Sequence, residues 1–177
     1  MHRASSILLL AGLLFFSSVA VSPAYELKTQ YATVVYDNQA LLQEFNDAIS
    51  LGSLSYLLRN RKSITSGDEV RNKIDVVVER VEAVLDMFPG GLKFTIVLLP
   101  RDTDVQKVYR AKYGVNVDYV AFYSPKEKTV YVSVDDIRLG VLAHELTHVV
   151  LDRYFGVSPP TKIHEVLAQF VETHLKD

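Results

Sequence analysis

Two histidines and a glutamate stand together in a short apolar stretch, residues 140–151 (GVLAHELTHVVL). They follow the order HExxH, with His144, Glu145 and His148. Because residues four apart lie on the same face of a helix, both imidazoles can bind one metal ion. The glutamate beside the first histidine can then hold a water molecule on that ion. The spacing predicts a zinc site formed by His144 and His148, with Glu145 as catalytic base.

The residues that flank this motif are almost all apolar, which predicts a buried helix. Burying two histidines and a carboxylate is unfavourable unless each finds a partner, and a divalent cation would satisfy all three. The chain has no cysteine, so any zinc ligands must be histidines and carboxylates. The alternative is a chance occurrence of the motif in a domain that binds no metal.

A catalytic zinc ion usually has three protein ligands and one position open for water. A histidine six residues after His148 is excluded, because Tyr154 stands there. The remaining candidates downstream are Asp152, His164, Glu165, Glu172 and His174.

Among these candidates, Glu165 and Glu172 share one side of the last expected helix. They lie about 10 Å apart along it, so only one of them can reach the ion. We favour Glu165, near the start of the helix, because Ala168 one turn later allows a close approach to the motif helix. An exposed first-turn carboxylate is the alternative for Glu165.

The other candidates have simpler interpretations. His164 and His174 fall towards the apolar side of their helix, which favours core or interface histidines. Glu172 is expected to be solvated or paired with Lys176. Asp152, one turn after His148, could orient that ring or be an exposed residue at the helix end.

Taken together, HELTH and Glu165 resemble the gluzincin zinc peptidases. Glu165 stands seventeen positions after His148, in HEVLAQF, with an E-x-x-A spacing. More closely, residues 29–177 resemble the small thermolysin-related minigluzincin, or peptidase MA-like, domains. The resemblance implies an α+β, zincin-like fold with a small mixed four-stranded sheet, and it gives Glu165 the role of third zinc ligand. The activity implied is hydrolysis of peptide bonds by a zinc-bound water that Glu145 activates.

The resemblance also implies an antiparallel edge strand before the strand that leads into the motif helix. Here that strand is residues 118–124, with Ala121, Phe122 and Tyr123 at its middle. An edge strand can bind an extended peptide by strand addition. Ordinary alternation of core and surface side chains in a hairpin is the alternative for these residues.

Two departures from the thermolysin pattern concern the catalytic cleft. Gln169 stands where thermolysin-type enzymes carry an aspartate that orients a zinc histidine. The large helical domain that completes the thermolysin cleft has no counterpart here, so the oxyanion donor could be Tyr154, His174 or a mobile tyrosine. The second hypothesis is therefore a zinc-containing binding or regulatory module without catalysis.

Length and composition restrict the remaining classes. The chain has 177 residues with 49% hydrophobic residues, enough for one domain, expected over residues 25–177. A formal net charge of −2 provides no electrostatic reason to expect nucleic acid as a partner. The expected partner is a peptide or protein substrate.

Residues 1–24 have the pattern of an export signal. Arg3 supplies a positive start, and residues 7–21 form an apolar run that is short for a membrane span. Small residues precede a cleavage point after Ala24, which predicts a secreted or periplasmic protein. The alternative is an uncleaved membrane anchor.

The remaining pattern predicts the elements that position the site. Apolar and β-branched runs indicate four strands, at residues 31–36, 94–99, 118–124 and 129–134. Helical spacing indicates helices at residues 39–59, 66–87 and 103–113. The motif helix is expected to be capped by Asp135 or Asp136 and to end at Gly156, and the last helix covers residues 162–175.

Overall fold

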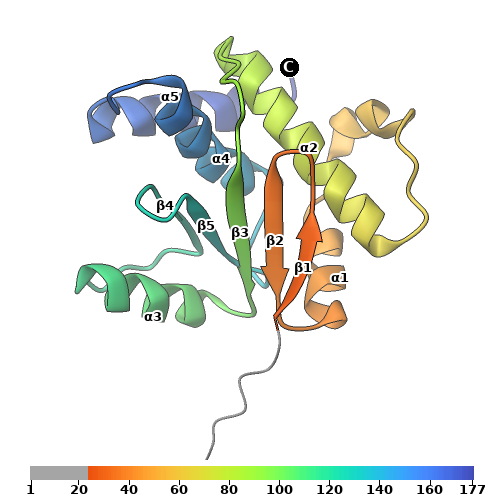
Figure 1. Ribbon diagram of the computed structural model, residues 1–177, viewed down its shortest axis with the longest axis horizontal. Coiled ribbons are helices and arrows are strands. Elements are labelled where there is room, and N and C mark those ends of the chain that lie inside the picture. The colour runs from red at the N-terminus through yellow and green to blue at the C-terminus, as the bar shows by residue number, and fades with distance from the viewer. Residues whose placement is uncertain (1–23) are drawn as a thin grey trace, which may run out of the picture.

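The computed structural model describes residues 24–177, so residues 1–23 of the expected export signal lie outside the described part. Within residues 24–177 the fold is mixed α+β, with a five-stranded sheet and six helices (Figure 1). No helix in this range is long and apolar enough to cross a membrane. The elements in chain order are β1 (Tyr25–Lys28), β2 (Ala32–Tyr36), α1 (Gln39–Ala48), the 3-10 helix η1 (Gly52–Leu58), α2 (Ser66–Leu85), β3 (Phe94–Leu99), α3 (Asp102–Tyr113), β4 (Ala121–Ser124), β5 (Thr129–Ser133), α4 (Leu139–Tyr154) and α5 (Thr161–His174).

The sheet has the strand order β1-β2-β3-β5-β4. Its three central strands β2, β3 and β5 are parallel, and β1 and β4 pair antiparallel at the two edges. The antiparallel edge strand expected from the sequence is therefore present, as β4. The prediction of four strands was wrong, because β1 adds a fifth. That strand has only four residues, which are mostly exposed, so it lacks the apolar alternation that marks a half-buried strand.

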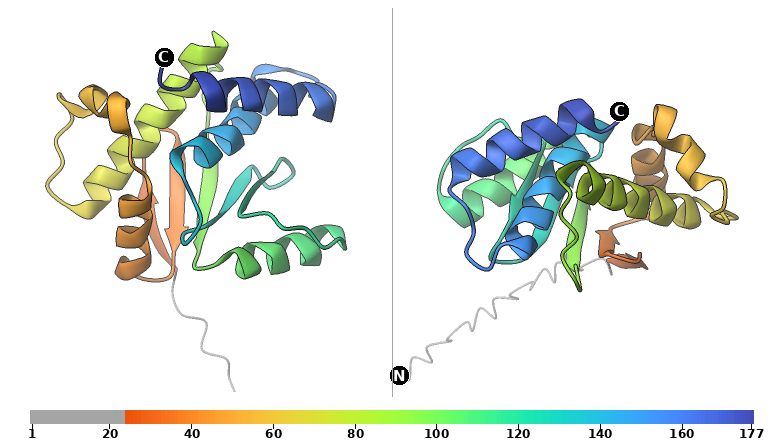
Figure 2. Two further views of the ribbon diagram at one scale, coloured as in Figure 1. Left: turned by 180° about the vertical axis from the view of Figure 1, so that it is seen from behind. Right: turned by 90° about the horizontal axis from the view of Figure 1, so that it is seen from above.

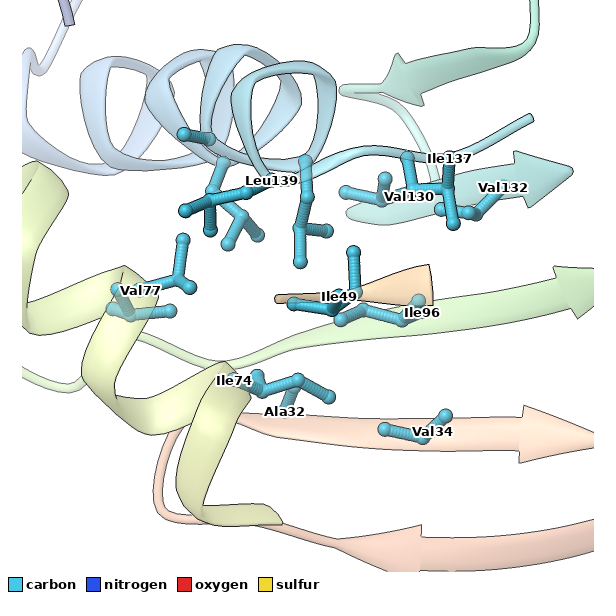
Figure 3. Packing of buried hydrophobic residues seen from close by; sticks show 14 of the residues in the cluster. Ala32, Val34, Ile49, Ile74, Val77, Ile96, Val130, Val132, Ile137 and Leu139 are labelled. Atoms are coloured by element: carbon cyan, nitrogen blue, oxygen red, sulfur yellow. The ribbon is translucent and has the colours of Figure 1, made fainter. Parts of the chain in front are cut away.

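Helices α2 and α4 cover one face of the sheet, where the main core lies (Figure 3). Alternate residues of the central strands, such as Val34, Ile96 and Val130, are fully buried on this face. The opposite face carries α3, whose Tyr109 ring lies 5.0 Å from the ring of Phe122 on β4. Successive strand residues point to opposite faces, so β4 contributes to both layers.

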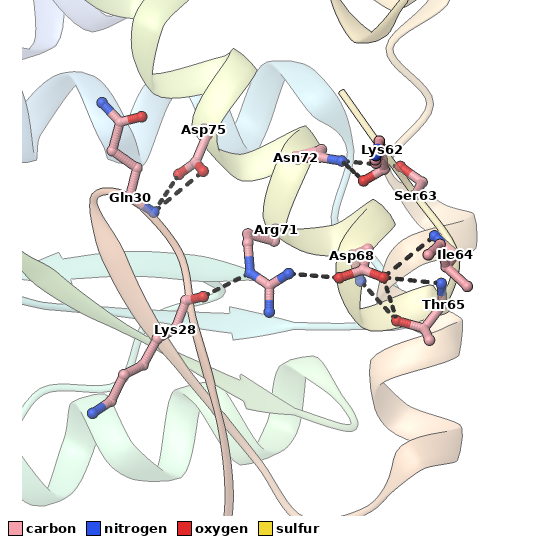
Figure 4. Close-up of polar contacts among 10 residues, drawn as sticks. All are labelled: Lys28, Gln30, Lys62, Ser63, Ile64, Thr65, Asp68, Arg71, Asn72 and Asp75. Atoms are coloured by element: carbon pink, nitrogen blue, oxygen red, sulfur yellow. Dashed lines mark hydrogen bonds and ion pairs between the residues drawn. The ribbon is translucent and has the colours of Figure 1, made fainter. Parts of the chain in front are cut away.

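Helix α2 is attached to the hairpin formed by β1 and β2. Its N-terminus is a capping box, in which Thr65 and Asp68 each bind a backbone N–H of the other residue. Arg71 donates to the backbone oxygen of Lys28 and to Asp68, and Asp75 accepts from the backbone N–H of Gln30 (Figure 4). These contacts fasten the edge hairpin, which alone would be only marginally stable.

Several element boundaries differ from the sequence predictions for local reasons. The helix expected over residues 39–59 is divided into α1 and η1, because Gly52 has a φ of 56° in the left-handed region. Helix α2 ends at Asp86, whose φ is 53°, before the Pro-Gly-Gly stop expected there. The motif helix begins at Leu139 rather than after Asp135 or Asp136, because Asp136 instead accepts a hydrogen bond from Ser133 in the preceding turn.

Truncation of a core residue on α2 should destabilise the protein strongly. Ile74 is fully buried between the helices and the sheet, whereas Ile64 is 87% exposed. We expect Ile74→Ala to lower the free energy of unfolding by about 2–5 kcal/mol, because it leaves a cavity in the core. Urea denaturation would measure this, with Ile64→Ala as the matched control. Equal effects of the two variants would contradict the placement of α2 over the sheet.

Candidate metal centre

The site is built on two helices that lie side by side, α4 and α5 (Figures 1 and 2). A six-residue connector containing Pro159 and Pro160 turns the chain back between them. Ala168 of α5 is fully buried, in agreement with the close approach expected from its small side chain. Because α4 is buried against the sheet and α5 covers its other side, the motif residues are shielded from much of the solvent.

Three side chains converge between these helices: His144, His148 and Glu165. One ligand atom from each lies within 4.8 Å of the others, so the group could hold a metal ion. The Nε2 atom of His144 lies 3.4 Å from one carboxylate oxygen of Glu165, and the Nε2 atom of His148 lies 3.6 Å from the other. The residues singled out in the sequence as ligands are therefore brought together, although they come from two helices.

These separations fit a tetrahedral metal ion better than they fit direct hydrogen bonds. Two ligand atoms, each about 2.0–2.1 Å from zinc at a tetrahedral angle, lie about 3.3 Å apart. Hydrogen bonds between nitrogen and oxygen are shorter, at roughly 2.7–3.2 Å. Two imidazoles and a carboxylate are also the donor set of many catalytic zinc sites. The two contacts use different carboxylate oxygens of Glu165. The group could hold a metal ion, and its donor set is one that zinc accepts.

Each imidazole of the group has a different partner at its Nδ1 atom. His164 faces His148, with 3.4 Å between the two Nδ1 atoms, and its Nε2 atom lies 3.0 Å from Ser158 Oγ. Glu172 places a carboxylate oxygen 3.5 Å from Nδ1 of His144. Both contacts leave the Nε2 atoms directed at Glu165, as a shared metal ion requires. The sequence offered both residues as candidate ligands, but it favoured a core or interface position for His164 and solvent or Lys176 for Glu172.

The remaining candidates lie elsewhere. Asp152 accepts a hydrogen bond of 2.9 Å from the hydroxyl of Tyr123, so its partner is the edge strand rather than the ring of His148. His174 is exposed and stacks on Phe170, with 4.2 Å between ring centroids, so the expectation of a core position was wrong. Neither residue belongs to the group that could hold a metal ion.

Glu145 is more deeply buried than the other carboxyl groups at the site, Glu165 and Glu172, and is only 9% exposed. The pKa of Glu145 is raised to about 7, chiefly by burial and in smaller part by the nearby charge of Glu165. The backbone N–H of Tyr123 donates to Glu145 and acts in the opposite direction. A carboxyl group with a pKa near neutrality can both accept and release a proton under physiological conditions.

His148 is held in the neutral form that a metal ligand requires. The pKa of His148 is lowered to about 4, chiefly by burial and in smaller part by the neighbouring His144 and His164. Because the imidazole is neutral at physiological pH, one ring nitrogen has a free lone pair, and the ring does not have to lose a proton before it binds a cation.

A cavity of about 500 Å³ opens beside the histidines. Ala121, Phe122 and Tyr123 of the edge strand all contribute to its wall, next to Glu145. Tyr109 of α3 and Tyr119 of the loop between α3 and β4 line it as well. No short-range pattern in the sequence shows where α3 and this loop pack, so neither tyrosine was expected at the site. Tyr154 and His174 are not among the lining residues.

The pKa shifts predict a pH-dependent stability of the protein stripped of metal. Between about pH 4 and 6.5 the unfolded chain binds more protons at His148, so this group makes stability rise with pH. Between about pH 4.5 and 7 the folded protein binds more protons at Glu145, so this group makes stability fall with pH. In wild type the two contributions oppose each other.

Glu145→Gln should expose the His148 contribution alone. We expect its free energy of unfolding to rise by up to about 3 kcal/mol from pH 4 to 6.5, more steeply than that of wild type. Urea denaturation in EDTA across this range would measure it, with the exposed Glu44→Gln as control. A profile parallel to wild type would show that Glu145 is not buried as described.

Comparison with known proteins returned no match among family models, curated sequences or solved structures. The function therefore has to be inferred from the site itself. There the buried carboxyl group of Glu145 lies beside His144, His148 and Glu165, which together could hold one metal ion.

Proposed function

We propose that this protein is a zinc-dependent peptidase of the gluzincin type, on a small zincin-like domain. The observation that carries the proposal is the arrangement of His144, His148 and Glu165 at separations suited to tetrahedral zinc, with Glu145 buried beside them. His144, Glu145 and His148 form the HExxH motif of α4, and Glu165 is supplied by the following helix. One zinc ion per chain is expected.

The protein's own groups divide the chemical work. When bound, a zinc ion would supply Lewis acidity, which acidifies water and polarises the carbonyl of a peptide bond. Glu145 would accept the proton of the attacking water at its carboxylate and deliver it to the nitrogen of the departing amine. His144, His148 and Glu165 would orient the ion and leave one of its positions open.

The edge strand supplies a means of holding an extended peptide. On the side away from β5, β4 has no strand partner among the described residues, so its backbone groups can pair with an added strand. Its side chains are already engaged, because Phe122 stacks on Tyr131 and Tyr123 binds Asp152. The backbone groups of Val120 and Ser124 bond inward, so by alternation those of Phe122 face β5 as well. Ala121 and Tyr123 would therefore offer the open backbone groups to a substrate, and the N–H of Tyr123 is already directed at Glu145.

The cavity supports a peptidase over a zinc-containing module without catalysis. A regulatory module would be expected to have a closed cleft or to lack an oxyanion donor, whereas about 500 Å³ of space adjoins the histidines. Tyr109, Tyr119 and Tyr123 are the tyrosines that line this space. The hydroxyl of Tyr123 already donates to Asp152, so the first two tyrosines could serve as the donor. With the export signal expected in residues 1–24, the proposed peptidase would act outside the cytoplasm, in the periplasm or the medium.

Removal of the base should abolish cleavage and leave the metal in place. We expect Glu145→Gln to lower kcat by at least about 100-fold, because general-base catalysis typically contributes a factor of that size or more. Cleavage of a peptide library, followed by mass spectrometry, would measure it, together with zinc content. The exposed Glu44→Gln should match wild type. Cleavage by Glu145→Gln at the wild-type rate would refute the mechanism, and a wild type that binds zinc but cleaves nothing would favour the regulatory module.

Removal of the third ligand should weaken metal binding. We expect wild type to contain one zinc ion per chain and Glu165→Ala to lose most of it on dialysis against a mild chelator. The loss of affinity should exceed the roughly 10- to 100-fold that removal of an outer partner of a ligand usually produces. Elemental analysis would measure the content, with the exposed Glu26→Ala on β1 as control. Unchanged zinc in Glu165→Ala would assign the third ligand to another residue.

A further inference from the structure

The imidazole of His144, on α4, lies between two carboxylates that both come from α5. Its Nε2 atom is 3.4 Å from Glu165, and its Nδ1 atom is 3.5 Å from Glu172. The two glutamates are seven residues apart, so they project from the same side of α5 about two turns, or roughly 10 Å, from each other. This spacing lets one helix place a carboxylate at each end of one imidazole ring.

Gly140 makes room for the second of these carboxylates. It precedes His144 by one turn of α4 and therefore lies on the same face. A Cβ atom added at Gly140 would lie 3.2 Å from both Cγ and one carboxylate oxygen of Glu172, which is tighter than almost all real contacts of this kind. The absence of a side chain at position 140 thus permits Glu172 to lie against α4 and reach His144.

From these contacts we propose that Glu172 is a positioning residue for His144. At 3.5 Å its carboxylate is in ion-pair contact with Nδ1, at a distance longer than a hydrogen bond. In the metal-bound protein it would be the acceptor for the Nδ1 proton and would favour the tautomer whose Nε2 lone pair faces Glu165. Metal-ligating histidines commonly donate their second N–H to such an acceptor, which orients the ring and increases its basicity. The inference rests on the metal centre of the proposed function and does not depend on cleavage of a peptide.

The two histidines would then be held differently by α5. The group that faces Nδ1 of His148 is the ring of a half-buried His164, whereas the group that faces Nδ1 of His144 is a carboxylate. Glu172 is 44% exposed, so solvent screens part of its charge. We therefore expect its removal to have an effect near the lower end of the range for such outer partners, about 10-fold in zinc affinity.

The test compares Glu172→Ala and Glu172→Gln with wild type by competition for zinc with a chromophoric chelator. We expect Glu172→Ala to weaken zinc about 10-fold. Glu172→Gln should have a smaller effect, because its amide oxygen can still accept the Nδ1 proton. The absorption spectrum of the Co²⁺-loaded protein should change in Glu172→Ala, since the ring is no longer fixed. Glu44→Ala, which removes an exposed carboxylate of α1 outside the cavity lining, is the matched control and should leave affinity and spectrum unchanged.

A steric variant separates positioning from a general effect on folding. Gly140→Ala should displace the Glu172 carboxylate and weaken zinc in the same direction, while alanine favours the helical conformation more than glycine does. Combined with Glu172→Ala it should add little, because both changes remove the same contact. The metal-free proteins should melt at similar temperatures.

The possible results are distinct. Zinc affinity and a Co²⁺ spectrum equal to wild type in Glu172→Ala would overturn the inference, as would full additivity of the two substitutions. If wild type binds zinc but cleaves no peptide, the peptidase is refuted and the affinity comparison still decides the role of Glu172. If wild type binds neither zinc nor Co²⁺, both proposals are wrong.

Discussion

The contact between α4 and α5 is the interaction on which the rest of the site depends. α4 supplies two imidazoles on one face, but by itself it places no carboxylate at their Nε2 atoms. The small, fully buried Ala168 lets α5 lie close enough for Glu165 to reach both rings. A larger residue there would separate the two helices and move Glu165 away from the histidines, because interhelical distance follows the side chains at the contact.

Burial of α4 prepares the motif for a cation. The same loss of solvent keeps His148 neutral and raises the pKa of Glu145. Both effects disfavour charge on these side chains in the metal-free protein. A divalent ion would therefore find the lone pair of His148 available. Glu145, held near its neutral form, would not compete with Glu165 as a charged ligand. The site is therefore costly to bury without an ion and well suited to one, which is the physical reason that a buried HExxH helix indicates metal chemistry.

The edge strand β4 is joined to the motif helix at two points. The backbone N–H of Tyr123 donates to Glu145, and its hydroxyl donates to Asp152, two turns further along α4. Burial and the bond to Asp152 raise the pKa of the Tyr123 hydroxyl, so it stays a donor throughout the physiological range. These two contacts fix the position of β4, which borders the cavity, relative to α4, which carries the proposed base.

The sequence alone determined the local parts of this protein: the motif helix with its three polar side chains, the central strands, and Glu165 as the favoured carboxylate. These follow from the periodicity of apolar residues and from the fixed geometry of a helix, which depend only on neighbouring positions. The tertiary structure decided what distant residues do. Glu172, expected in solvent or paired with Lys176, is exposed and also faces His144. Asp152 pairs with Tyr123, and the hairpin strand β1 joins the sheet. Such partnerships depend on how α5 and the edge strands pack against α4 and β2, and short-range patterns carry no information about that packing.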